Sequence, residues 1–529
     1  TTVPGRSAIT SKYEYNDLRQ LEKKTVTVPN QNRGTTTVYT RGYTYAVIAE
    51  DDGCNRMGTR LASTDYKFGS NSRSFTYTYD KAGNIKSVMA SDSVGKLYDY
   101  DGLGQLVKET PIGLTMYAVT YAYDTAGNIR SITRGGTTFK SFGYTNPSWP
   151  DLLTSVTANG TTKDVLYEGQ SQMSDVPTSG NPVTYYNGRD YHFDWSKGRQ
   201  LTEAVVGGQT VKYAYDMAGV RSSKQVGDTT YTYTTLSGKV MRQAWGDNNA
   251  LEFVYDDSSQ PFAVIYKHGS AAELYYYLVN AQGDVAAILD SSGTMVASYN
   301  YDAWGSCTVY NSSDAAIGDL NPLRYRGYYY DAETGFYYLQ SRYYDPAICR
   351  FINADTFATT DANGFLSANM FAYCENNPIM RVDADGEIWN VIAGAVIGAG
   401  LEVLGQLMTG TKFADINWGS VAMEGALGAV SSLGIPARIT SKLGKVAFTA
   451  FKDVVIPTTV EVRSQIKTNK RVNYTKTAIT ASKASINSAV TAGTDRLLKS
   501  TSSRMAKAVV HSTRQLFFFT FGLISKFWR

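Results

Sequence analysis

The residues with the strongest chemical character gather in one block, residues 321–355, which has the densest aromatic and arginine content of the chain. Clusters of tyrosine alternate there with turn residues such as Gly327 and Gly335. Planar guanidinium groups can stack on aromatic rings and also donate paired hydrogen bonds to carboxylates. This chemistry suits a closing seam that excludes water and leaves every charge with a partner. The arginines of the block are Arg324, Arg326, Arg342 and Arg350.

Cysteine and histidine are few and are widely separated along the chain. Neither CxxC nor HExxH spacing occurs among them. We therefore predict no metal and no cofactor, and we expect isolated buried thiols rather than a disulfide. The residues concerned are Cys54, Cys307, Cys349 and Cys374, and His192, His268 and His511.

The composition favours β-structure, and the length of the chain indicates more than one structural unit. A chain of 529 residues is too long for one compact core, and its 40 tyrosines stand against 20 phenylalanines. The net charge of +4 hides an asymmetry, because residues 388–529 hold 18 Lys and Arg against 6 Asp and Glu. A mildly acidic body therefore precedes a basic C-terminal region.

A tyrosine–aspartate unit recurs through the body. Its aspartate falls at positions 80, 101 and 124, and again at 194 and 216, which gives a period of 21 to 23 residues. One period has room for two strands and two turns. The clearest copies are YTYDKAGNI from Tyr77, YDYDGLGQL from Tyr98, YAYDTAGNI from Tyr121 and YAYDMAGVR from Tyr213.

The residue pattern of each unit predicts a β-hairpin. Tyrosines two residues apart, such as Tyr77 and Tyr79, place both rings on one face of a strand. The Asp-x-x-Gly that follows is a turn, in which the carboxylate accepts backbone N–H groups and glycine takes a positive φ. A lone hairpin is marginal in water, so we expect many of them to stack edge to edge into a β-shell or solenoid. An alternative is a carbohydrate-binding array, which would need the rings exposed in a groove.

The segment RYRGYYYDAETGFYYLQSRYYDPAICRFINAD, residues 324–355, closely resembles the core-domain signature of RHS and YD-repeat proteins, especially the forms of Gram-positive bacteria. The match runs over thirty residues with its turns in place. It implies a β-shell of spiralling strands, as in RHS toxins, the C component of insecticidal toxin complexes and teneurins. The core block would close one end of that shell.

In RHS proteins that release a C-terminal cargo, a self-cleavage pattern follows this block. The resemblance implies two catalytic aspartates, Asp355 and Asp383, and a scissile bond near Glu387 and Ile388. The matching positions are Arg350 with Phe351, then Asp355, then Asn377 with Pro378, and finally Asp383 with Gly386.

Paired carboxylates suit this reaction, because two acids held close share one proton and can act as base and acid towards a water molecule. A guanidinium such as that of Arg350 would bias which acid stays ionised. We therefore expect a single-turnover aspartyl autoprotease. The alternative is structural: Asp355 and Asp383 are turn residues that cap a plug, with Arg350 as their ion partner.

Several positions depart from the pattern of cleaving relatives. Thr356 and Ala384 replace two prolines, and the interval between the two aspartates is a few residues longer. Asp385 is a rival for the second carboxylate. The remaining departures are Cys349 and Ala358, which replace glycines, and Glu387, which replaces an apolar residue.

The C-terminal region changes character at Ile388, where tyrosine gives way to alanine, valine, serine and glycine at helical spacing. Residues 388–408 are apolar and long enough to span a bilayer, and the last 14 residues resemble an interfacial anchor. We weigh effector helices held in the shell, a membrane-perturbing effector drawn to anionic lipid, and a nuclease. The nuclease is disfavoured because no paired acidic and histidine constellation is present, so we expect no nucleic-acid partner.

The sequence thus predicts a mainly β chain with a mainly α C-terminal region. We expect a YD-repeat β-shell over residues 1–320, a core block or plug over 321–387 and a divergent effector region over 388–529. We expect the chain to be the C-terminal part of a longer, secreted or cell-surface protein that encapsulates and presents an effector, with an immunity protein as partner. The alternative is a surface adhesion or carbohydrate-binding protein that releases no toxin.

Overall fold

The computed structural model describes residues 9–29, 35–49, 55–236, 238–256, 258–312, 317–355, 369–383 and 386. The chain divides into two compact units, Thr1–Asn390 and Val391–Arg529, and all described residues belong to the first. The predicted helical region 388–529, the predicted scissile bond at Glu387 and Ile388, and Cys54 therefore lie outside the described residues. No helix within the described ranges has the length and apolar character to cross a membrane.

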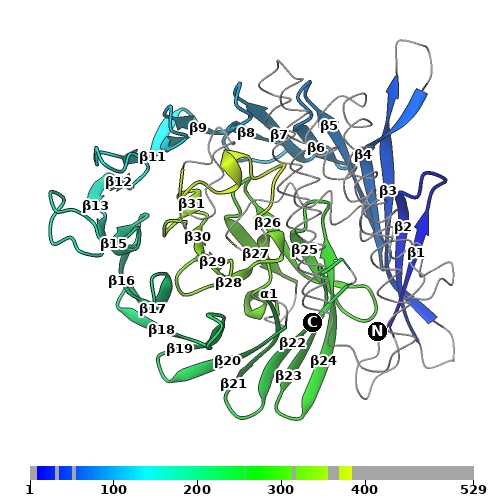
Figure 1. Cartoon of the computed structure of the whole chain (residues 1–529). Coiled ribbons are helices and arrows are strands. Elements are labelled where there is room, and N and C mark those ends of the chain that lie inside the picture. Colours follow the sequence, from blue (N-terminus) through cyan, green and yellow to red (C-terminus); the bar gives the residue numbers. More distant parts are fainter. Residues whose placement is uncertain are drawn as a thin grey trace, which may run out of the picture. The chain divides into compact units, whose positions relative to one another are not determined.

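Two large antiparallel sheets follow the chain order, so that each strand pairs with the next one in sequence (Figure 1). This confirms the prediction of stacked hairpins. The first sheet contains β1 (Thr10–Tyr15), β2 (Leu21–Pro29), β3 (Thr35–Ala49), β4 (Asn55–Phe68), β5 (Asn71–Tyr79), β6 (Ile85–Ala90), β7 (Gly95–Tyr100), β8 (Leu106–Ile112), β9 (Val119–Tyr123), β10 (Ile129–Arg134), β11 (Thr137–Gly143), β12 (Ser155–Ala158) and β13 (Thr161–Asp164). The second contains β14 (Leu166–Tyr167), β15 (Pro182–Tyr186), β16 (Asp190–Ser196), β17 (Gln200–Val206), β18 (Gln209–Tyr215), β19 (Arg221–Val226), β20 (Thr229–Leu236), β21 (Lys239–Trp245), β22 (Asn249–Tyr255), β23 (Pro261–His268), β24 (Ala271–Val279), β25 (Val285–Leu289), β26 (Met295–Tyr301) and β27 (Cys307–Asn311).

A short helix and a third, small sheet follow. Helix α1 (Ile317–Leu320) packs against β26 and β27. The small antiparallel sheet contains β28 (Tyr329–Asp331), β29 (Phe336–Tyr338), β30 (Tyr343–Asp345) and β31 (Arg350–Phe351). Two 3-10 turns, η1 (Tyr325–Gly327) and η2 (Cys374–Asn376), complete the described elements.

The repeated aspartate closes its hairpin in the predicted way at Asp80, Asp101, Asp124 and Asp216, whereas Asp194 lies within strand β16. In the turn after β7, Asp101 accepts the backbone N–H groups of Leu103 and Gln105 at 2.9 Å and the Gln105 side-chain amide at 2.6 Å. Gly104 has a φ of +81° and donates its N–H to the Asp101 carbonyl at 3.0 Å. The turn therefore needs a carboxylate at its first position and glycine at its fourth.

The two tyrosines of each unit have different environments and contacts. The first ring is buried, as for Tyr98 and Tyr121, each 5% exposed. The second bonds the preceding unit: the Tyr100 hydroxyl donates to the Ile85 carbonyl at 2.8 Å, and the Tyr123 hydroxyl to the Leu106 carbonyl at 2.6 Å. The same bond recurs from Tyr79 to Leu61, Tyr215 to Leu201, Tyr255 to Val240 and Tyr301 to Val285. Successive repeats are therefore joined by side chains as well as by the strand ladder.

We expect Asp101→Ala to lower the free energy of unfolding by about 1–3 kcal/mol, since two backbone N–H groups and the buried Gln105 amide lose their acceptor. Asp99→Ala is the matched control, because Asp99 is an exposed residue of the adjoining strand. Urea denaturation measures both variants. Equal losses would show that the carboxylate of the turn has no special part in stability.

Strands β23 to β25 are nearly continuous in apolar residues because both of their faces are buried. One face, which includes Leu278 and Leu289, packs with Val26 and Val38 of the first sheet. The other face, which includes Tyr277, packs with Ile317 of α1. The beginning of the first sheet therefore covers the later strands of the second.

Candidate functional site

The small sheet β28–β31 is the predicted seam. Its largest rings, such as Phe336, Tyr337 and Tyr344, are fully buried, and they contact residues of both large sheets. The Tyr344 hydroxyl, for example, donates to the Trp304 carbonyl at 2.7 Å. The block thus forms a plug that packs against both large sheets, and Figure 1 shows its strands beside them.

Two buried carboxylates of the plug, Asp331 and Asp345, have partners from the second large sheet. Asp331, at the end of β28, pairs with Arg221 at 2.5 Å and with Lys224 at 3.1 Å, and all three are buried. Asp345, at the end of β30, accepts hydrogen bonds from the Tyr185 hydroxyl and the Asn187 amide at 2.8 and 2.7 Å. Burial raises the pKa of Asp345. Both carboxylates are therefore buried with polar partners, which are cations for Asp331 and neutral hydrogen-bond donors for Asp345.

The two predicted catalytic aspartates lie close together, joined by one guanidinium. Nη2 of Arg342 lies 3.1 Å from Oδ2 of Asp355 and 3.3 Å from Oδ2 of Asp383. Arg199 lies 3.7 Å from the other oxygen of Asp355. Asp383 and Arg342 are buried, and the Asp355 side chain is 11% exposed. We call Asp355, Asp383 and Arg342 the acid pair and its arginine.

Arg342 is held on every side. Its guanidinium lies 3.6 Å from the centre of the Phe351 ring, Nη1 donates to the Met370 carbonyl at 3.1 Å, and Nε donates to the Gly386 carbonyl. The sequence analysis includes Arg342 among the four arginines of the block but does not predict that it contacts the aspartates. Spacing alone does not show which of the four arginines does so, because their partners come from distant parts of the chain.

Arg350 has different partners, which corrects the expectation that it pairs with the two aspartates. Its guanidinium donates to the Tyr144 hydroxyl at 2.7 Å and to the Asp151 carbonyl at 2.8 Å, and it stacks on the Phe371 ring. The physical reason is the alternation of side chains along β31: Phe351 lies against Arg342, so the preceding residue, Arg350, points to the opposite face of the strand. Arg350 therefore ties the plug to the first large sheet.

Asp383 also caps a turn, as the structural alternative expected. Its Oδ1 accepts the Gly386 N–H at 2.8 Å, and its carbonyl accepts the Tyr328 hydroxyl at 2.6 Å. Gly386 has a φ of +79°, and a side chain there would approach the Leu339 carbonyl to 2.9 Å. Gly386 therefore lies next to the acid pair. The rival Asp385 lies outside the described residues.

Two asparagines fix this segment to the repeat turns of the first sheet. The Asn377 amide donates to the Asn84 side chain at 3.1 Å and to the Gly104 carbonyl at 2.9 Å. The neighbouring Asn376 amide donates to the Gln105 side chain at 2.9 Å and to Gly127 at 2.7 Å. Three successive repeats therefore position the segment that carries Asp383. Sequence reasoning matched Asn377 to the family pattern but did not predict this role.

A wall of tyrosine–aspartate hairpins, joined by an arginine- and tyrosine-rich plug, defines an RHS/YD-repeat shell protein. The chain belongs to the teneurin YD-shell family, which its residues 7–379 match. This confirms the resemblance seen in the sequence.

Individual relatives share only part of their length with this chain. It is 34% identical over 387 residues to the tRNA nuclease WapA of Bacillus subtilis. The aligned region covers 65% of this chain and 16% of that protein. The chain is 34% identical over 360 residues to the tRNA3(Ser)-specific nuclease WapA of Bacillus spizizenii, covering 60% and 15%. It is 28% identical over 211 residues to the double-stranded DNA deaminase toxin A of Burkholderia cenocepacia, covering 35% and 14%.

Among solved structures, the crystal structure of TcdB2-TccC3-TEV is similar, with a TM-score of 0.48 and 19% identity. The similarity covers 72% of this chain and 20% of that one.

Proposed function

We propose that the repeat wall and plug are a carrier that encapsulates and presents residues 388–529 as an effector. Family membership supports this proposal. So does the fact that the relatives are named for different activities, a tRNA nuclease and a DNA deaminase, although each shares sequence with this chain. A segment common to proteins of unlike activity is best explained as the shared carrier. A secreted or cell-surface location and an immunity partner follow from the same reasoning.

The carrier also cleaves itself near Glu387, with Asp355 and Asp383 as the acid and base. The observation that carries this step is that Arg342 contacts both carboxylates and the carbonyl of Gly386, the residue before Glu387. One carboxylate would take a proton from a water molecule while the oxygen of that water attacks the carbonyl carbon of the scissile bond. The other carboxyl group, in its protonated form, would protonate the leaving nitrogen. One water is consumed, and a new carboxyl terminus and a new amine are formed.

The intact mass of the purified chain tests self-cleavage. We expect the parent to yield two fragments with a boundary near residue 387, and Asp355→Asn and Asp383→Asn to cleave at least about 100-fold more slowly. Asp345→Asn is the matched control, because it changes another buried carboxylate of the plug that lies outside the acid pair. We expect it to cleave like the parent. A parent that stays whole would end the protease proposal.

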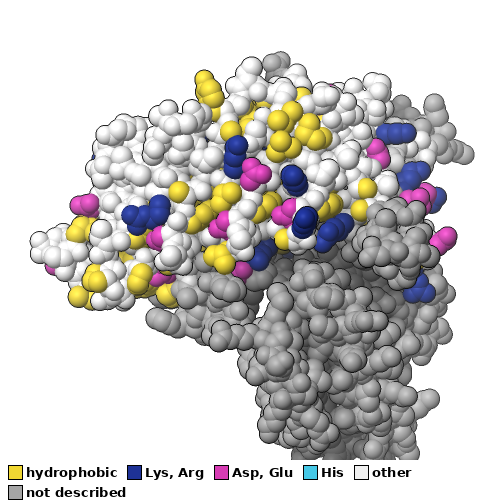
Figure 2. All heavy atoms as spheres, turned by 90° about the horizontal axis from the view of Figure 1, so that it is seen from above, with side chains coloured by type: hydrophobic (Ala, Val, Ile, Leu, Met, Phe, Trp, Pro, Cys, Tyr) yellow, Lys and Arg dark blue, Asp and Glu magenta, His cyan; other side chains and the backbone are white. Residues whose placement is uncertain are grey.

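The effector is expected to act on membranes, given its apolar stretches and excess of basic residues. Release of dye from vesicles of anionic lipid, compared with degradation of plasmid, distinguishes this activity from a nuclease. The described face in Figure 2 intersperses Lys and Arg with Asp and Glu, so that face does not present a track of one sign for nucleic acid.

The carbohydrate-binding alternative requires exposed ring faces. The first rings of the repeats, such as Tyr77 and Tyr213, are instead buried at 8% and 5% exposure. These tyrosine rows therefore act in packing and do not form a sugar-stacking groove.

A further inference from the structure

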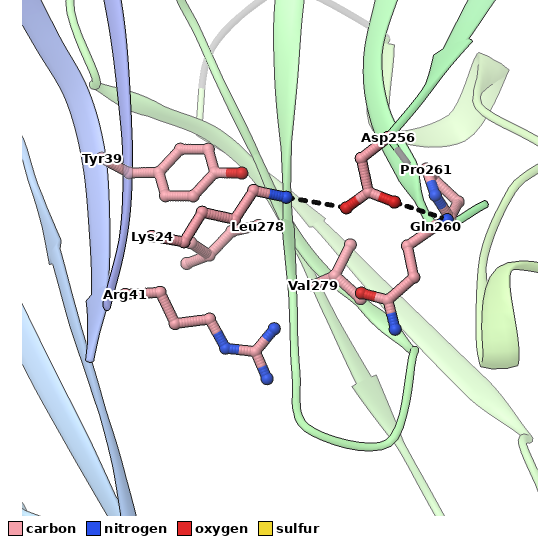
Figure 3. Close-up of a pocket in the computed structure, with 8 residues that line it drawn as sticks. All are labelled: Lys24, Tyr39, Arg41, Asp256, Gln260, Pro261, Leu278 and Val279. Carbon is pink, nitrogen blue, oxygen red and sulfur yellow. Dashed lines mark hydrogen bonds and ion pairs between the residues drawn. The ribbon is translucent and has the colours of Figure 1, made fainter. Parts of the chain in front are cut away.

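A small cavity lies where β2 and β3 of the first sheet meet β22–β24 of the second (Figure 3). Its volume is about 10 Å³, taken as the space open to the centre of a water molecule. That is room for one occupant of about the size of water. The residues that line it are Lys24, Tyr39, Arg41, Asp256, Gln260, Pro261, Leu278 and Val279.

The charges around this cavity do not balance. Lys24 pairs with Asp256 at 2.7 Å, and both side chains are about nine-tenths buried. The Gln260 N–H donates to the other oxygen of Asp256 at 2.9 Å. Arg41 is 7% exposed, its guanidinium points into the same space, and its Nε has no hydrogen-bond partner. Among the described residues no carboxylate forms an ion pair with Arg41, which leaves one positive charge in excess.

The aromatic neighbours of Arg41 do not supply the missing charge. The guanidinium lies 4.6 Å from the centre of the Tyr43 ring and 5.3 Å from that of Tyr66. Burial raises the pKa of Tyr43 to about 12 and raises that of Tyr39 further above its ordinary value. These two hydroxyls are therefore neutral at pH 7. Ring faces stabilise a cation only in part, and a largely buried guanidinium without an anion is costly.

We propose that this cavity binds one small monovalent anion of about the size of chloride. The anion would accept N–H groups from Arg41, with the Lys24 ammonium and the Gln260 amide lining the same space. Such a site neutralises the excess charge and fastens the early strands of the first sheet to β22–β24. The small volume excludes sulfate and phosphate, whose several oxygen atoms do not fit.

Thermal unfolding of the full chain at constant ionic strength tests the proposal. When chloride replaces gluconate, we expect the Tm of the parent to rise in a saturable way by about 2–4 °C, and Arg41→Gln to lose this rise. Sulfate should stabilise the parent and the variant equally, since it acts outside the cavity. Arg73→Gln is the matched control, because Arg73 stacks on Phe75 but is exposed and paired with Asp92.

A second measurement covers the case in which Arg41→Gln fails to fold. Crystals of the parent grown in bromide should show an anomalous peak within hydrogen-bonding distance of the Arg41 guanidinium. A parent Tm that ignores chloride, an equal chloride response in a folded Arg41→Gln, or an absent bromide peak would each overturn the proposal.

Discussion

Asp331→Asn, which keeps the size of the side chain but removes its charge, is expected to lower the free energy of unfolding by about 3–5 kcal/mol. The carboxylate is fully buried, and it contacts Arg221 at 2.5 Å and Lys224 at 3.1 Å. Its loss leaves two cations inside the seam with too little negative charge. Rings of the plug, such as Tyr338 at 4.3 Å from the Arg221 guanidinium, offset only part of that cost.

Glu333→Gln is the matched control for this substitution. Glu333 also contacts Lys224, at 2.8 Å, but its side chain is 17% exposed, so water can take over part of its role. We expect a loss of about 1 kcal/mol, measured by urea denaturation. The double variant Arg221→Met with Asp331→Leu removes both partners of the ion pair. It should lower the free energy of unfolding by less than Asp331→Asn does. A double variant that is less stable than the single one would contradict the account.

The pH dependence of this contribution follows from the direction of the pKa shift. Burial alone would raise the pKa of Asp331, but Arg221 and Lys224 more than offset it and hold the pKa below its ordinary value of 3.8. A carboxyl whose pKa is lowered by folding contributes its stability above the unfolded pKa. The difference between parent and Asp331→Asn should therefore stay constant from pH 8 to about pH 5 and shrink only below about pH 4.

Arg342→Met is expected to have an effect of similar size, about 3–5 kcal/mol at pH 7, because it removes the buried guanidinium that contacts both Asp355 and Asp383. Denaturation curves of the parent and the variant at pH 7 measure the effect. Arg342→Lys retains the charge and should recover part of the stability.

Arg350→Met is the control for Arg342. Both arginines are buried in the plug and stack on a phenylalanine ring. Arg350, however, donates to a hydroxyl and a carbonyl, so its removal leaves neutral acceptors. We expect a loss of about 1–3 kcal/mol. A loss as large as that of Arg342→Met would refute a special role of Arg342 between the two acids.

Local rules account for the repeat wall. The turn at Asp101 and the inward ring of Tyr98 depend on residues within a few positions, so the 21 to 23 residue period could be converted directly into hairpins. The match of residues 324–355 to a family signature likewise predicted the plug. Pairing of each strand with its neighbour in sequence then follows, because such contacts close the shortest loops.

Long-range contacts account for what the sequence left open. Whether Arg342 or Arg350 joins Asp355 and Asp383 depends on how β30 and β31 face the rest of the fold, and no spacing along the chain encodes that choice. The hydrogen bond from the Asn377 amide to the Gly104 carbonyl joins residues 273 positions apart. The excess positive charge at Arg41 likewise arises only when β3 packs near β24. Hairpins and turns were readable from the sequence because their energies are local, whereas the partners of buried charges were not, because dense packing of distant segments selects them.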